Sequence, residues 1–207
     1  TNIYVCKQDT DGKIKWVKTV RTYVDLFVRG SGVALDGLGG VYTTGSFLGE
    51  FDFDPGAGVH TLGKEDETNA YIWKLSTDGE FRWARTLGGD GASFGFGIAA
   101  DNSGNIYGTG AFFGTRDFDP GEGEFNLSSG DHDDIYVWRL DALGNFQWAG
   151  AMGGSGSPPF PRKAVRASGL EITRDDPALG EAYARLVRAR RSDSPPGNGH
   201  EPVPMEE

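Results

Sequence analysis

Residues 36–47 read DGLGGVYTTGSF, and residues 101–112 read DNSGNIYGTGAF. The two stretches lie 65 residues apart, and the acidic motif that follows each of them keeps the same interval. That motif reads DFDPGAG at residues 52–58 and DFDPGEG at residues 117–123. So many landmarks in one register indicate a tandem structural repeat.

Landmarks later in each copy keep the interval too. The segment YIWKL at residues 71–75 matches YVWRL at 136–140, and Trp83 matches Trp148. A truncated copy comes before them, in which Trp16 is the counterpart of Trp83 at a distance of 67 residues. The sequence therefore predicts one partial copy followed by two full copies.

Each full copy is predicted to form four short antiparallel strands. In the last copy the strands are expected at residues 97–101, 105–112, 135–140 and 145–149. Turn-forming Asp, Asn, Ser and Gly residues separate the first strand from the second and the third from the fourth. In the fourth strand Phe146 and Trp148 alternate with polar residues, which is the period of a half-buried strand.

A four-stranded sheet of this kind has to bury its apolar faces against neighbouring sheets. Radial stacking of such sheets forms a β-propeller, so we predict an all-β fold of about two and a half four-stranded antiparallel blades. The ring is expected to be incomplete, because closed rings have about four blades or more. The remaining blades would come from a longer chain, which the start in mid-blade favours, or from self-assembly. The repeat also predicts like surroundings for Tyr42 and Tyr107.

The motifs quoted above resemble the bacterial β-propeller repeats often called SBBP repeats. The resemblance rests on the Asp-x-x-Gly-Asn turn, the Asp-Phe-Asp-Pro-Gly element and the Gly-x-Phe-x-Trp strand, and it covers residues 1–154. One departure is the pair Gly39-Gly40 where the second copy has Gly104-Asn105. Such repeats typically occur in large exported or cell-surface proteins. The resemblance implies this architecture and an extracellular or cell-surface location, with any export signal upstream of residue 1, but it implies no reaction.

The repeat region is expected over residues 1–154, with a partial copy over about 1–27 and full copies over 28–92 and 93–154. Residues 155–161 are a linker by composition, because Ser, Gly and Pro dominate them. The tail, residues 162–207, carries none of the repeat landmarks.

In the tail, Asp176 and Pro177 favour the start of a short helix over residues 177–191, and residues 192–207 are expected to be disordered. Two interpretations stand side by side. The tail is either an interaction helix that covers an exposed sheet edge, or a foreign junction whose Ala/Arg/Pro bias does not belong to the repeats.

The repeat region carries the whole net charge of −10. Residues 1–154 hold 12 Lys and Arg against 22 Asp and Glu, whereas the remaining residues hold 8 of each. An acidic surface repels phosphate backbones, so nucleic acid is not expected as a partner. No run of about 18 apolar residues is present, so no membrane span is expected either.

Two pairs of carboxylates are candidates for a metal site. Asp52 and Asp54, and again Asp117 and Asp119, point to one side of an extended segment and could hold calcium with backbone carbonyls of the following Gly-x-Gly loop. The simpler interpretation is a turn, in which Asp caps the loop, Pro sets φ and Gly adopts a left-handed conformation. The spacing of EF-hand ligands is absent, and calcium is the only cofactor that the sequence suggests.

Other groups point to structure rather than chemistry. The acidic clusters at residues 65–67 and 130–134 are expected to be solvated, and His132 has no second histidine beside it, so zinc is not expected. Cys6 stands where later copies have Trp73 and Trp138 and is interpreted as a packed thiol. The tryptophans are interpreted as packing residues, and solvent exposure of Trp73 and Trp138 would instead favour a carbohydrate-stacking surface.

The sequence contains no Gly-x-Ser-x-Gly, His-Glu-x-x-His or Walker-type loop. We therefore expect a non-catalytic extracellular or cell-surface propeller module for interaction or spacing, with a protein or carbohydrate ligand that stays unidentified. A calcium-stabilised adhesion or glycan-binding module is one alternative. A fragment of a propeller hydrolase, with its catalytic residues elsewhere, is another.

Overall fold

The structure is a computed structural model, and it describes residues 3–20, 27–130 and 132–153. The first strands are β1 (Tyr4–Gln8), β2 (Ile14–Thr19), β3 (Val28–Leu35), β4 (Val41–Leu48), β5 (Phe51–Asp52), β6 (Thr61–Leu62), β7 (Thr68–Leu75) and β8 (Phe81–Thr86). The later ones are β9 (Gly88–Ala100), β10 (Ile106–Asp117), β11 (Asn126–Ser128), β12 (Asp134–Leu140) and β13 (Phe146–Met152).

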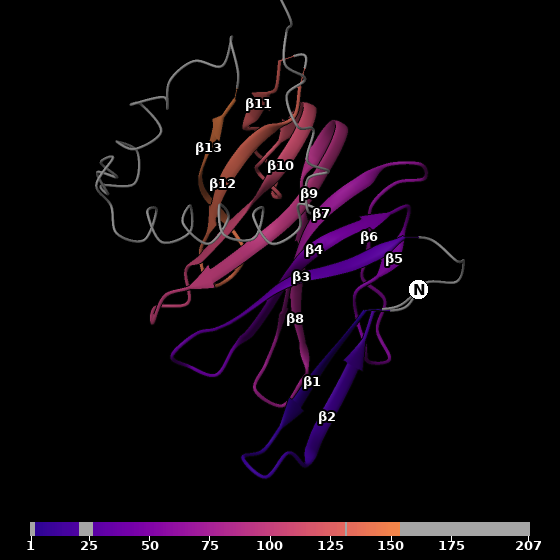
Figure 1. The fold of residues 1–207 in the computed structure, drawn as a ribbon, viewed down its shortest axis with the longest axis vertical. Coiled ribbons are helices and arrows are strands. Elements are labelled where there is room, and N and C mark those ends of the chain that lie inside the picture. Colours follow the sequence, from indigo (N-terminus) through magenta and orange to yellow (C-terminus); the bar gives the residue numbers. More distant parts are fainter. Residues whose placement is uncertain (1–2, 21–26, 131, 154–207) are drawn as a thin grey trace, which may run out of the picture.

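Every strand pairing in the described ranges is antiparallel, so the predicted all-β class is confirmed. The N-terminal hairpin is β1-β2, the first sheet has the order β3-β4-β7-β8, and the second sheet has the order β9-β10-β12-β13 with β11 also paired to β10. The pair β5-β6 forms a small hairpin of its own. Figure 1 shows the sheets following one another along the molecule, with no closed ring among the described residues.

The four strands predicted for the last copy are confirmed as β9, β10, β12 and β13. β9 and β10 differ most from the expected bounds, since β9 begins at Gly88 and β10 runs to Asp117. Their pairing continues to the match of Gly88 with Asp117, and the same end of β10 pairs with β11 on its other side. The predicted linker, tail and helix over residues 177–191 lie outside the described residues.

Five of the hairpin turns share one type, with Asp or Ser as the first residue and Gly as the fourth. The carboxylate of Asp101 accepts from the backbone N–H groups of Ser103 and Asn105, at 2.9 Å each. Gly104 has φ +80° and donates to the carbonyl of Asp101, a geometry that favours glycine. The same arrangement occurs in the turns that begin at Asp9, Asp36, Ser76 and Asp141.

The two full sheets bury the same aromatic set on the face toward the preceding element. In the first sheet the rings of Phe47 and Phe53 lie 5.3 Å apart and those of Phe53 and Tyr71 lie 5.2 Å apart. Their counterparts 65 residues later lie at 5.5 and 5.3 Å, in the pairs Phe112–Phe118 and Phe118–Tyr136. Equal spacing in both copies indicates that the repeated sequence forms one repeated core.

Trp73 and Trp138 close these cores. Their exposed fractions are 0% and 1%, so the packing interpretation is confirmed and neither ring is available for stacking on a sugar. The indole N–H of Trp138 donates to the carbonyl of Phe118 at 2.8 Å.

Tyr42 and Tyr107 agree in one ring contact and differ in burial. The ammonium of Lys74 lies 4.9 Å from the Tyr42 ring, and the guanidinium of Arg139 lies 5.7 Å from the Tyr107 ring. However, Tyr42 is fully buried between the sheets and donates to Asp36, whereas Tyr107 is half-buried. The predicted similarity of surroundings therefore holds for the contact within each sheet. It fails for burial, because a further sheet packs against Tyr42 and none of the described sheets packs against Tyr107 in the same way.

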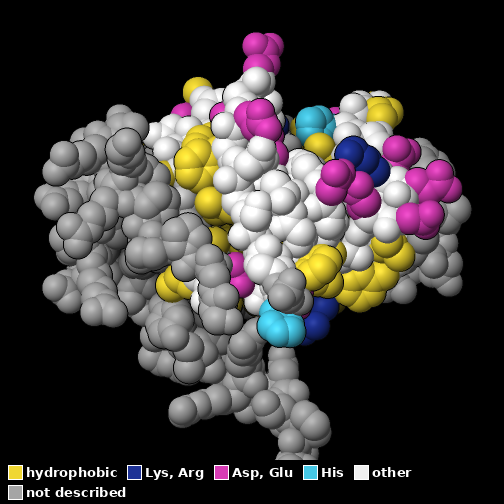
Figure 2. All heavy atoms as spheres, turned by 90° about the horizontal axis from the view of Figure 1, so that it is seen from above, with side chains coloured by type: hydrophobic (Ala, Val, Ile, Leu, Met, Phe, Trp, Pro, Cys, Tyr) yellow, Lys and Arg dark blue, Asp and Glu magenta, His cyan; other side chains and the backbone are white. Residues whose placement is uncertain are grey.

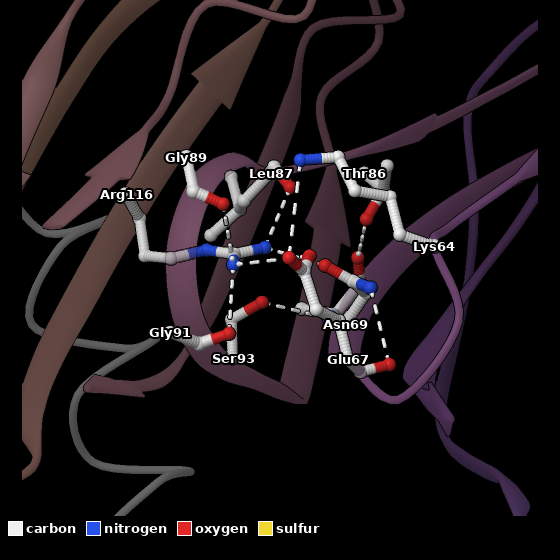
Figure 3. Close-up of polar contacts among 10 residues, drawn as sticks. Lys64, Glu67, Asn69, Thr86, Leu87, Gly89, Gly91, Ser93 and Arg116 are labelled. Atoms are coloured by element: carbon white, nitrogen blue, oxygen red, sulfur yellow. Dashed lines mark hydrogen bonds and ion pairs between the residues drawn. The ribbon is translucent and has the colours of Figure 1, made fainter. Parts of the chain in front are cut away.

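Arg116 breaks the repeat, since it stands where the first copy has the buried Phe51. Its side chain is fully buried at the junction of the two sheets (Figure 3). It donates to the carbonyls of Leu87 at 2.7 Å and Gly91 at 2.9 Å, and to the side chain of Asn69. Burying a cation costs far less when several acceptors surround it than when it is unpaired. The contacts with Leu87 and Asn69 hold β10 against the first sheet, whereas the contact with Gly91 lies within the second sheet.

We predict that Arg116→Met lowers the free energy of unfolding by about 3–5 kcal/mol, because buried acceptors lose their donor. Chemical denaturation measures the loss. The exposed Arg82→Met serves as control and should change stability by less than about 0.5 kcal/mol. Equal effects of the two substitutions would contradict the structural role of Arg116.

Candidate functional site

The acidic loops that follow β4 and β10 satisfy much of their own polarity. Asp52 accepts from the backbone N–H groups of Asp54 at 3.0 Å and His60 at 2.8 Å, and Asp54 accepts from Gly56 at 2.7 Å. One carboxylate oxygen of each Asp is therefore used within the loop. Phe51 and Phe53, which alternate with the two aspartates, are buried.

The second loop repeats these bonds. Asp117 accepts from Asp119 at 2.9 Å and Phe125 at 2.8 Å, and Asp119 accepts from Gly121 at 2.8 Å. A Cβ atom at Gly123 would lie 2.3 Å from the second carboxylate oxygen of Asp119, so a larger residue there would force that carboxylate to move. The motif thus has a structural explanation in both copies.

The structure keeps the two acidic pairs apart in separate loops. Within the described ranges no group of three or more His, Cys, Asp or Glu side chains could hold a metal ion. Calcium at Asp52, Asp54, Asp117 and Asp119 stays a prediction that would depend on backbone carbonyls for the other ligands. Asp131, part of the second acidic cluster, lies outside the described residues.

His60 has a structural position. Its ring lies 5.0 Å from that of Phe81, and its Nε2 lies 3.3 Å from the carbonyl oxygen of Ala84. In the second copy Phe125 takes the same place and lies 4.9 Å from Phe146. An aromatic contact that a phenylalanine replaces in the other copy indicates packing rather than acid–base chemistry.

A repeated contact between consecutive sheets is the feature that sequence reasoning missed. The ammonium of Lys7 and the indole N–H of Trp16 both donate to the backbone carbonyl of Thr77, at 2.8 and 3.1 Å. Thr77 is the second residue of the β7–β8 turn of the first sheet. The N-terminal hairpin therefore binds the turn of the sheet that follows it.

The first sheet makes the same contact with the second sheet. Lys74 and Trp83 donate to the carbonyl of Ala142 in the β12–β13 turn, at 2.8 and 3.2 Å. We call this arrangement of a cation and an indole on one turn carbonyl the inter-sheet contact. The signal in the sequence was the basic residue that recurs in register with each tryptophan, at Lys7, Lys74 and Arg139.

Charge supports the inter-sheet contact. Burial lowers the pKa of Lys74, and the carboxylates of Asp36 and Asp141 oppose that shift. Burial also lowers the pKa of Arg85, whose guanidinium donates to the carbonyl of Gly144 at 3.1 Å, and Asp141 again opposes it. The acidic first residue of the turn thus lies close to the basic residues that bind that turn.

Acidic side chains outnumber basic ones on one face of the molecule (Figure 2). Figure 2 shows several groups of Asp and Glu on one face, with few Lys and Arg among them. Among the described residues, no helix is long and apolar enough to cross a membrane. No family model matches the sequence, and a search of curated proteins finds no similar protein.

We predict that Asp52→Ala and Asp117→Ala each lower stability by about 1–3 kcal/mol, because two backbone N–H groups lose their acceptor. Thermal unfolding with and without calcium separates this role from metal binding. A bound calcium ion would raise the melting temperature of the unsubstituted protein but not that of the double variant Asp54→Asn, Asp119→Asn, in which both loops lose a carboxylate. An unchanged melting temperature on adding calcium would contradict the metal prediction.

Stability should fall in acid. Burial raises the pKa of Asp141, but hydrogen bonds from Asn145 and from the backbone of Leu143 outweigh it, so the pKa lies below its ordinary 3.8. A carboxylate with a lowered pKa stabilises the fold above the unfolded pKa and loses that effect as the pH falls through the folded pKa. Asp141→Asn keeps an acceptor oxygen without titrating, so its melting temperature should fall less between about pH 5 and about pH 2. Identical acid profiles would contradict this assignment.

Proposed function

We propose that this chain is a non-catalytic β-propeller repeat module of an extracellular or cell-surface protein, which serves interaction or spacing by stacking sheets. The observation that carries the proposal is the inter-sheet contact, made at Thr77 and again at Ala142 with the same donor types. A contact that recurs with the sequence repeat supports assembly by addition of like sheets.

The use of the two sheet faces supports the same proposal. Phe47 and Trp73 of the first sheet belong to the cluster shared with the N-terminal hairpin, whereas Tyr42 and Ile72 belong to the cluster shared with the second sheet. The second sheet turns Trp138, the counterpart of Trp73, toward the first. Consecutive sheets with the same face turned backward are typical of propeller blades.

Several side chains with catalytic potential are used for structure instead. The hydroxyl of Ser93 is fully buried and accepts from the backbone N–H of Ala70 at 2.9 Å. Ser129 likewise accepts from Gly114 at 2.9 Å. These contacts favour the scaffold interpretation over the hydrolase alternative, and the resemblance to SBBP repeats supports the extracellular location.

Adding sheets tests the proposal. A chain in which residues 88–152 are repeated once or twice in tandem should gain equal increments of strand signal in circular dichroism, and its melting temperature should rise with each unit. A unit of the same composition with its residue order scrambled is the matched control, and it should add no strand signal. Added units that stay unfolded, or that fold without changing the melting temperature, would contradict a stacking module.

A further inference from the structure

The second sheet carries the donors of another inter-sheet contact without an acceptor. Trp148 and Arg139 are the counterparts of Trp83 and Lys74. The indole N–H of Trp148 and the Nε–H of Arg139 are buried and have no hydrogen-bond partner. Buried donors without partners are costly, which indicates that this side of the sheet is built to receive a carbonyl.

The N-terminal hairpin carries the matching acceptor without its donors. Its turn begins at Asp9, and Thr10 is the counterpart of Thr77 and Ala142. A Cβ atom at Gly79 would lie 2.9 Å from the Trp16 ring, because a tryptophan covers that turn. At Gly12 the same atom would have nothing within 4 Å. Among the described residues, Trp148 thus has no turn carbonyl as a partner, and the β1–β2 turn has no tryptophan against it.

We propose that the second sheet binds the β1–β2 turn of a second copy of this chain, head to tail, with the Thr10 carbonyl accepting from Trp148 and Arg139. The inference rests on the proposed function, since it extends the stacking of like sheets from one chain to two. Arg139 is already placed for the contact, because its guanidinium lies over the Tyr107 ring as Lys74 lies over Tyr42.

Charge complementarity supports this partner. In the internal contact the carboxylate of Asp141 lies close enough to Lys74 and Arg85 to oppose the lowering of their pKa values by burial. Asp9 is the counterpart of Asp141, and its pKa is lowered by hydrogen bonds from Lys15 and the backbone of Lys13. The ionised Asp9 would therefore meet the guanidinium of Arg139 across the interface.

An interface between two different surfaces of the same chain does not close by itself. It generates rings or open chains of copies, depending on the rotation between neighbours. A substitution at either surface should block self-association, and two such variants should bind each other once, since each retains the surface that the other lacks.

Sedimentation velocity of the full chain over a wide concentration range tests the inference. The unsubstituted protein should form dimers and larger species as concentration rises. Gly12→Asn adds a side chain at the open turn with less strain than other residues would cause, because asparagine is enriched at positive φ. Arg139→Glu reverses the charge at the other surface. Each should weaken association about tenfold or more. Arg82→Glu, an exposed site outside the inter-sheet contact, is the charge-matched control and should associate normally.

The decisive sample is an equimolar mixture of Gly12→Asn and Arg139→Glu, which should form a one-to-one dimer and nothing larger. Thermal melts confirm that both variants fold. A chain that stays monomeric at every concentration overturns the inference, as does a mixture that fails to dimerise. Monomers whose tandem 88–152 units still fold and stabilise one another would refute the head-to-tail contact while leaving the stacking function intact.

Discussion

A sheet that is apolar on both faces cannot be stable alone, and this constraint governs the whole molecule. The first sheet buries Phe47 and Trp73 on one side and Tyr42 and Ile72 on the other, so it needs a neighbour on each side. The N-terminal hairpin and the second sheet supply those neighbours. Each unit must present compatible faces to the units before and after it. The sequence accordingly repeats the same apolar positions every 65 residues.

Hydrophobic faces alone would allow neighbouring sheets to slide, and polar contacts fix their relative position. The inter-sheet contact places a lysine and an indole on a single carbonyl, which defines where each turn sits. Arg116 adds a second fixed point, since its donors reach the carbonyl of Leu87, between β8 and β9, and those of Gly89 and Gly91 in β9. Replacing the Phe51 of the first copy by this arginine makes the junction between the two full sheets more polar than the equivalent region of the first copy.

The acidic motif illustrates how a conspicuous sequence can have a local purpose. Asp52 and Asp117 hold their loops by accepting from backbone N–H groups up to eight residues away. These carboxylates accept hydrogen bonds from loop N–H groups that have no backbone partner and would otherwise bond to water. The carboxylates that give the chain its negative surface thus include several that also shape its turns.

The strands, the turns and the repeated aromatic core follow from the sequence, because alternation, turn-forming residues and a fixed interval are local properties. Residues 106–112 and 134–140 pair as the repeat predicted, and the Asp101 turn has the expected geometry. Pairing beyond residue 112 of β10, the burial of Arg116 and the indole bonds to Thr77 and Ala142 were decided by tertiary structure. Each depends on which backbone carbonyl lies opposite a side chain after two sheets have packed, and a carbonyl is present at every residue, so sequence alone does not single one out.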